Sequence, residues 1–118
     1  MQYPQDLAVT VAAIGDSVSI VAEGELDAFT RSRLIRAVTG VVRCTDRVVV
    51  EVSGLTFVDA TSYAALIDLA READAGGTEL VFRNPSRSLL RSRQLLDTGR
   101  VLNIEYTSRN SEGAPSLG

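Results

Sequence analysis

The sequence of 118 residues contains no histidine and no lysine, and its single cysteine is Cys44. Without histidine there is no imidazole general base, no Ser-His-Asp triad and no imidazole metal ligand. Without lysine there is no Schiff base and no phosphate-binding lysine of the P-loop type. One cysteine forms no intrachain disulfide and cannot supply a four-cysteine zinc site. These absences exclude most common catalytic chemistry, so we expect no enzymatic activity, no metal and no cofactor.

The sequence also has no excess of positive charge, because its 15 acidic residues outnumber its 12 arginines and leave a net charge of −3. Nucleic-acid binding normally needs a basic face, so direct binding to nucleic acid is not expected. No uncharged apolar run approaches the roughly 20 residues that span a bilayer. Met1 to Leu7 has neither the basic nor the apolar region of a signal peptide. Together with the single cysteine, these features predict a protein of the reducing cytoplasm that does not insert into membranes.

What the chain does contain is a regular alternation of strand-like and helix-like segments. Period-two patterns and runs of β-branched residues predict strands, whereas apolar residues at a spacing of three and four predict helices. The first half of the chain is expected to form strands over 7–14 and 17–23 around a Gly15-Asp16 turn, then a helix after Asp27 whose start Asp27 or Thr30 caps, a strand over 48–52 and a loop over 54–59. The second half is expected to form a helix ending at Gly76-Gly77, a strand over 80–82, a helix from Asn84-Pro85-Ser86 to about Leu96 that Thr98-Gly99 closes, and a strand over 101–104.

The order β-β-α-β-α-β-α-β determines the fold class that we expect. Strands that alternate with helices need crossover connections and therefore form a mostly parallel sheet. We predict an α/β fold with a mixed sheet of four to five strands, an N-terminal antiparallel hairpin and about three helices. Residues 1–106 are expected to form a single domain, and the polar residues 107–118 a disordered C-terminal tail.

The segment from Leu55 to Leu66 is the most informative part of the chain. A buried strand leads through a short loop into a helix whose first turn holds Asp59, Thr61 and Ser62. Ligands and partners of parallel sheets meet the loops at the carboxyl ends of the strands, and a helix N-terminus attracts negative charge. The simpler interpretation is that Asp59 is only a helix cap, which is worth about 1 kcal/mol. Local chemistry alone favours the cap.

Two short motifs resemble the signatures of a known family. Gly24-Glu25-Leu26-Asp27 follows the second expected strand, and Ser53-Gly54-Leu55-Thr56-Phe57-Val58-Asp59 precedes the second expected helix. Both are similar to the STAS domain, and most similar to the bacterial anti-sigma factor antagonists. The resemblance extends over about residues 7–106 and implies the same order of strands and helices.

The resemblance implies a function in binding. Such proteins bind an anti-sigma factor, often a kinase, and release a sigma factor for transcription. The kinase phosphorylates the residue directly after the motif aspartate, which adds negative charge to the contact surface and breaks the complex. The partner-binding and regulatory residues that this implies are Glu25, Asp27, Asp59, Ala60, Thr61, Ser62 and Tyr63. For Asp27, a role in capping the following helix is at least equally expected.

The sequence departs from the family pattern at the regulated position. Ala60 follows the motif aspartate, and its methyl side chain accepts no phosphate. Either the phosphorylation switch is lost, or Thr61 or Ser62 is the acceptor instead. Neighbouring helix positions point about 100° apart, so a new acceptor needs a different kinase geometry, and we favour loss of the switch. Thr61→Glu or Ser62→Glu is expected to weaken partner binding and leave the fold intact.

Other interpretations stay open at this point. An accessory subunit of a membrane transport system, docked on its ATPase, is the alternative function. A third possibility is an enzyme whose nucleophile site is Asp59 with Thr61 or Ser62. Such a site needs a general base, and the sequence offers none. The cluster Arg83, Arg87, Arg91 and Arg93 is best interpreted as a solvated face, and Cys44 as a structural or incidental thiol. A monomer or a weak dimer is expected.

Overall fold

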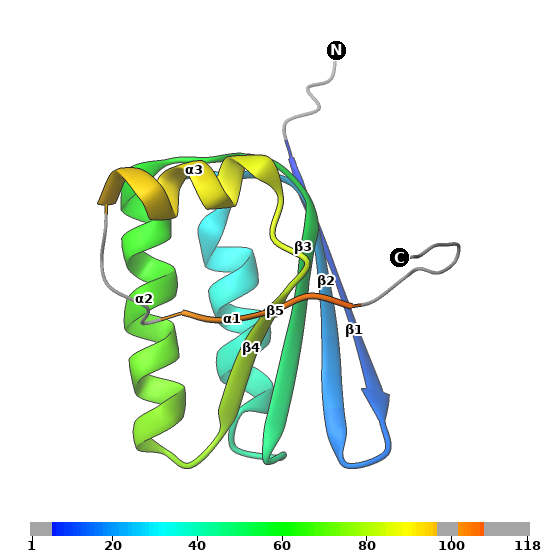
Figure 1. The fold of residues 1–118 in the computed structure, drawn as a ribbon. Coiled ribbons are helices and arrows are strands. Elements are labelled where there is room, and N and C mark those ends of the chain that lie inside the picture. Colours follow the sequence, from blue (N-terminus) through cyan, green and yellow to red (C-terminus); the bar gives the residue numbers. More distant parts are fainter. Residues whose placement is uncertain (1–5, 97–101, 108–118) are drawn as a thin grey trace.

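The computed structural model describes residues 6–96 and 102–107, which form one mixed sheet and three helices (Figure 1). The sheet order is β1-β2-β3-β4-β5, with β1 antiparallel to β2 and the other neighbouring pairs parallel. The predicted α/β fold with its N-terminal hairpin is therefore confirmed. The elements are β1 (Leu7–Ile14), β2 (Ser17–Leu26), α1 (Arg31–Val41), β3 (Arg47–Val58), α2 (Ala60–Ala75), β4 (Glu79–Arg83), α3 (Arg87–Leu96) and β5 (Asn103–Glu105).

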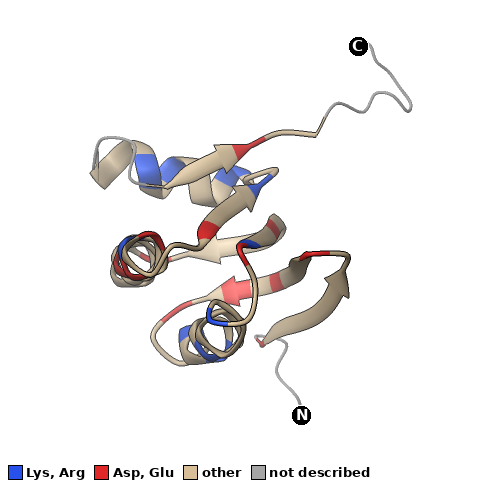
Figure 2. Ribbon diagram, turned by 90° about the horizontal axis from the view of Figure 1, so that it is seen from below, with Lys and Arg blue, Asp and Glu red and all other residues tan. Residues whose placement is uncertain are grey.

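The hydrophobic core lies between the sheet and the helix pair α1 and α2. Seen from below in Figure 2, both helices lie on the same side of the strands. Alternate residues of β3, Val48, Val50 and Val52, face them and are completely buried. The other face of the sheet carries charged residues beside the buried Val49 and Val81, and Arg47 pairs with Glu79 there at 2.9 Å between Nη1 and Oε1. The alternation of side chains along a strand therefore gives this sheet one apolar face under the helices and one mixed face that carries ion pairs.

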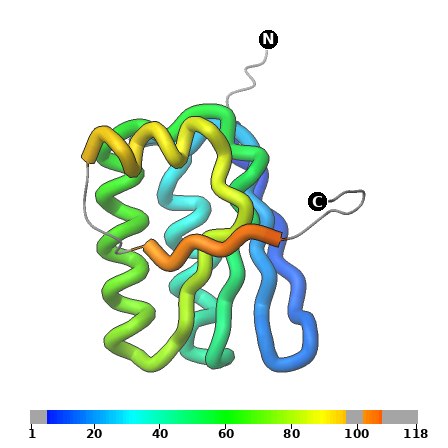
Figure 3. The backbone as a smooth tube through the Cα atoms, in the orientation of Figure 1, coloured from blue at the N-terminus to red at the C-terminus, as the bar shows by residue number. Residues whose placement is uncertain are grey.

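The hairpin that opens the chain forms as predicted. Ile14 pairs with Ser17 across the two-residue turn, and Gly15 has a φ of 60°. Two-residue hairpin turns need positive φ angles, which glycine adopts without steric cost. This turn lies at the amino end of the parallel strands, the lower end in Figure 3.

The predicted loop over 54–59 is wrong, because β3 continues to Val58. Its last residues pair in parallel with an equally extended β2, and two register shifts interrupt the pairing, between Val21 and Glu23 and between Gly24 and Glu25. Bulges of this kind add residues without ending a strand, and period-two arguments do not detect them. The two STAS-like motifs are thus neighbouring strand ends.

Helix α1 begins at Arg31 with Thr30 as its N-cap, the second of the two expected cap residues. Residues 27–30 form a turn in which Oδ1 of Asp27 accepts hydrogen bonds from the backbone N–H groups of Phe29, at 2.9 Å, and Thr30, at 3.1 Å. The N-cap of α1 is therefore Thr30, and a role of Asp27 as the cap is wrong. Asp27 orders the turn that precedes the helix, and it does not begin the helix itself.

The C-terminal elements follow the prediction closely. Helix α3 begins at Arg87, after a turn in which Oγ of Ser86 accepts a hydrogen bond from the N–H of Leu89 at 3.2 Å. The last strand, expected over 101–104, is Asn103–Glu105. Val101 and the Thr98-Gly99 helix stop lie outside the described residues, as do residues 108–118 of the expected tail. The domain limits stay a prediction.

Helix α3 covers the part of β3 that extends beyond β4. The last pair between these strands is Glu51 with Arg83, so the remaining residues of β3 have no neighbour from β4. Ser88 donates to the carbonyl of Thr56 at 2.8 Å, and Ser92 donates to the carbonyl of Val58 at 3.0 Å. The serines therefore supply hydrogen bonds that a neighbouring strand would otherwise make.

This arrangement gathers the ends of several elements at one edge of the sheet. Figures 1 and 3 show the starts of α1 and α2, together with α3, at the carboxyl ends of β2 and β3, the upper end of both views. Among residues 6–96 and 102–107, no helix is both long enough and apolar enough to cross a membrane.

Candidate functional site

The N-terminus of α2 is capped by Asp59, as predicted. Asp59 has extended backbone angles, and its Oδ1 accepts a hydrogen bond from the N–H of Ser62 at 2.8 Å. The Thr61 hydroxyl donates to the same oxygen at 3.2 Å. The backbone N–H of Asp59 bonds to the carbonyl of Leu26 at 3.2 Å, which ties the start of α2 to the end of β2. The second motif is thus held against the first by the main chain.

Arg31 joins the starts of the two helices, and sequence analysis did not identify it. Its Nη1 donates to the Thr61 hydroxyl at 2.7 Å and reaches the Ser62 hydroxyl at 3.5 Å. Arg31 and Thr61 are 30 positions apart and belong to different periodic segments, so no spacing in the sequence relates them. Only the packing of α1 beside α2 brings the two side chains together.

The same contacts shift the pKa of the Asp59 carboxyl. Burial alone raises this pKa, but hydrogen bonds from Ser62 and Thr61 and the positive charge of Arg31 outweigh burial, so the pKa is lowered from its ordinary value. The ionised form is therefore favoured in the folded protein, as expected for a carboxylate that accepts several hydrogen bonds beside an arginine.

We expect Asp59 to stabilise the protein at neutral pH and to lose this contribution in acid. A carboxyl whose pKa is lowered by folding stabilises the native state above its unfolded pKa, near 4, and this stabilisation disappears as the pH falls through the folded pKa. Asparagine caps helices about as well as aspartate and has no charge, so Asp59→Asn isolates the charge. Urea unfolding of both proteins between pH 7 and pH 3 should show the wild-type advantage shrinking below about pH 4. A difference that does not vary with pH would contradict a role for this charge.

The predicted site residues lie at the same edge, but they are not equally accessible. Ala60 and Thr61 are exposed, while Glu25, Asp27 and Asp59 are partly buried. By contrast, Ser62 and Tyr63 are 0% and 1% exposed, because they lie on the side of α2 that faces the core. The accessible part of the predicted site is therefore its outer face.

Two exposed aromatic side chains adjoin this edge, and sequence analysis gave neither a site role. Phe29, in the turn between β2 and α1, is 90% exposed, and Phe57, near the end of β3, is 48% exposed. Apolar side chains that stay in water beside a polar helix start are typical of surfaces that contact another protein. Their sequence signal was weak, because an aromatic residue is more often part of a core.

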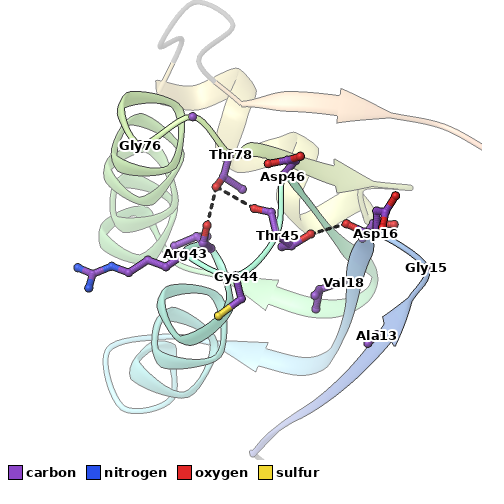
Figure 4. Close-up of a pocket in the computed structure, with 13 residues that line it drawn as sticks. Ala13, Gly15, Asp16, Val18, Arg43, Cys44, Thr45, Asp46, Gly76 and Thr78 are labelled. Atoms are coloured by element: carbon purple, nitrogen blue, oxygen red, sulfur yellow. Dashed lines mark hydrogen bonds between the residues drawn. The ribbon is translucent and has the colours of Figure 1, made fainter.

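A hollow lies at the opposite end of the molecule, beside the hairpin turn and the end of α1 (Figure 4). It has a volume of about 620 Å³, and the exposed Cys44 lies on its rim. Its hydroxyl groups are bonded to backbone carbonyls: Thr78 donates to Val42 at 2.6 Å, and Thr45 donates to Asp16 at 2.5 Å. Among the described residues, no group of three or more metal-binding side chains is found. The interpretation of Cys44 as a structural or incidental thiol stays a prediction.

Three solved structures illustrate the resemblance to known folds. An anti-sigma factor antagonist from Mycobacterium paratuberculosis has a TM-score of 0.71 at 15% identity, with 92% of each chain covered. The Bacillus cell fate determinant SpoIIAA, in its phosphorylated form, has a TM-score of 0.66 at 17% identity, with 86% of this chain and 93% of that chain covered. A putative anti-sigma factor antagonist from Thermotoga maritima has a TM-score of 0.71 at 15% identity, with 85% and 86% covered.

At these identities the solved structures establish a shared fold and no more. No curated protein matches the sequence significantly. The family itself is identified from the sequence, because residues 8–111 match the STAS domain. This match includes both motifs and every described element except the first residue of β1, Leu7. The chain therefore belongs to the STAS domain family.

Proposed function

We propose that this protein is an anti-sigma factor antagonist that acts by binding, through the surface around the start of α2. The observation that carries the proposal is that the Gly24–Asp27 and Ser53–Asp59 motifs, distant in sequence, lie side by side as paired strand ends. They present the exposed Ala60 and Thr61 next to the exposed Phe29. The fold shared with an anti-sigma factor antagonist supports the same function.

We further propose that the protein is permanently competent to bind. Ala60 has no hydroxyl, and the Ser62 side chain is completely buried, so a kinase can reach neither as an acceptor. The Thr61 hydroxyl is accessible, but it accepts a hydrogen bond from Arg31 and donates one to Asp59. Phosphorylation of Thr61 would remove the proton that it donates to Asp59 and would place negative charge beside the Asp59 carboxylate. In this proposal, control depends on the amount of the protein and not on its modification.

The alternative function, an accessory subunit docked on a transport ATPase, would use the same fold. None of the contacts within residues 6–96 and 102–107 favours it. Catalysis is not proposed either, because the groups that contact the Asp59 carboxyl are hydrogen-bond donors and a cationic guanidinium, none of which acts as a base. Binding is the function that this chemistry supports.

The proposal is tested by capture of an anti-sigma factor and by release of the sigma factor from it. Immobilised protein should retain an anti-sigma factor from extracts of the source cells, and the purified protein should displace sigma factor from the recombinant anti-sigma complex. Displacement should persist with ATP present, and the mass of the protein should stay unchanged by mass spectrometry. Retention of transport ATPase subunits would support the alternative function. Stoichiometric phosphate on Thr61 would contradict permanent competence.

A further inference from the structure

A shallow groove extends from the start of α2 onto α3. Its volume is about 200 Å³, and Phe57, Val58 and Ala60 form one wall. The other wall is a single face of α3, which presents Ser88, Arg91, Ser92, Leu95 and Leu96. Those positions have the spacing i, i+3, i+4, i+7 and i+8, so they form one continuous stripe along the helix.

The groove is lined by apolar side chains that remain in water. Phe57 is 48% exposed, Leu95 76% and Leu96 38%. These three side chains stay exposed although α3 is hydrogen-bonded to the end of β3 through Ser88 and Ser92. Exposed apolar residues that gather in a concave patch beside polar groups mark sites of contact with other molecules.

The rim of the groove is positively charged, in contrast to the protein as a whole. Helix α3 carries Arg87, Arg91 and Arg93 and no acidic residue, while the chain has a net charge of −3. Figure 2 shows blue segments and no red on α3. Within the part of the chain that the structure describes, neither Arg87 nor Arg91 has a carboxylate at salt-bridge distance; the described ion pairs involve other arginines.

We propose that this groove, here called the α3 groove, receives an apolar side chain from an acidic segment of the anti-sigma factor. The inference rests on the proposed function and specifies the chemistry of its partner. The apolar side chain would cover Phe57 and Leu95, and carboxylates beside it would pair with Arg87 and Arg91. A nucleic acid is a poorer occupant, because the groove between the arginines is lined by Phe57, Leu95 and Leu96 and the chain as a whole has a net charge of −3.

The α3 groove is continuous with the surface around Thr61, because Ala60 belongs to both. The small methyl group of Ala60 leaves the groove open towards the start of α2. A partner that contacts Thr61 would therefore extend over Ala60 into the groove without a gap. Apolar anchors inside such a contact provide much of the affinity, while charges at the rim provide specificity and speed of association.

The test compares two groove variants with two matched controls, using calorimetry with the anti-sigma factor that the wild type retains. Leu95→Ser removes an anchor and Arg91→Glu reverses a rim charge, and each should weaken binding about tenfold, the equivalent of about 1.4 kcal/mol. Both side chains are exposed, so thermal unfolding should be nearly unchanged. The controls Ile14→Ser and Arg43→Glu make the same changes at the opposite end of the molecule and should bind as the wild type does.

The salt dependence of binding provides a second readout. Wild-type affinity should fall as salt rises, and Arg91→Glu should reduce this dependence, because a pairing charge has been removed. If the wild type binds the anti-sigma factor and both groove variants bind equally well, the α3 groove is not the contact and the proposed function stands. If the wild type retains no anti-sigma factor, the proposed function and this inference are both overturned.

Discussion

Gly24→Ala is expected to destabilise the protein by about 3 kcal/mol. Gly24 has a φ of 119°, in a region that other residues adopt only with strain. A Cβ atom at this position would also overlap the backbone carbonyl oxygen of Asp6 and lie 3.3 Å from the Cα of Leu7. Backbone atoms cannot rotate away as a side chain can, so the start of β1 would have to separate from β2. Urea unfolding should show a lower midpoint with an unchanged m value.

Gly54→Ala is the matched control, because it lies in the other motif and pairs with the neighbouring residue, Glu23. A Cβ here would meet Glu23 Cγ at 2.8 Å, part of a flexible and exposed side chain that can turn away. We therefore expect a change of less than about 1 kcal/mol. Equal losses for both substitutions would show that the close approach at Gly24 is not what makes glycine necessary there.

Thr61→Glu is expected to raise the Kd for the anti-sigma factor roughly 30-fold, the equivalent of about 2 kcal/mol, with little effect on folding. Thr61 is exposed in the first turn of α2, where a negative charge is stabilised by the helix dipole and by nearby Arg31. The same charge would be placed in the proposed contact, where partner binding would have to remove its water. Calorimetry measures the binding, and thermal unfolding checks the fold.

The matched control is Thr39→Glu, the same substitution at an exposed threonine of α1, with Arg36 and Arg43 at helical spacing from it. It should bind as the wild type does, and equal binding by Thr61→Glu would remove the start of α2 from the contact surface. Ser62→Glu is not a useful substitute. Its side chain is completely buried, so the sequence-based expectation that the fold would survive this change does not hold for the structure.

Much of the fold could be predicted from local patterns. The period of two in β2 and the β-branched run in β3 identified their strands, and Tyr63, Leu66 and Ile67, apolar at helical spacing, are buried on the core side of α2. The residues at which strands and helices begin and end were harder to predict. The extension of β3 to Val58 depends on pairing with a distant β2 through bulges, and the turn before Arg31 depends on side-chain bonds of Asp27. Neither is a property of a short stretch of sequence.

The sequence by itself determined the family, the order of the elements, the cap at Asp59 and the absence of a hydroxyl at residue 60. These are local properties, because a motif, a period or a methyl group is the same in any fold. Only the tertiary structure decided which residues meet. It brought Arg31 into hydrogen-bond contact with Thr61, buried Ser62 and kept Leu95 exposed to solvent. The reason is that distances and exposure depend on how distant elements pack, which the spacing of residues along the chain does not determine.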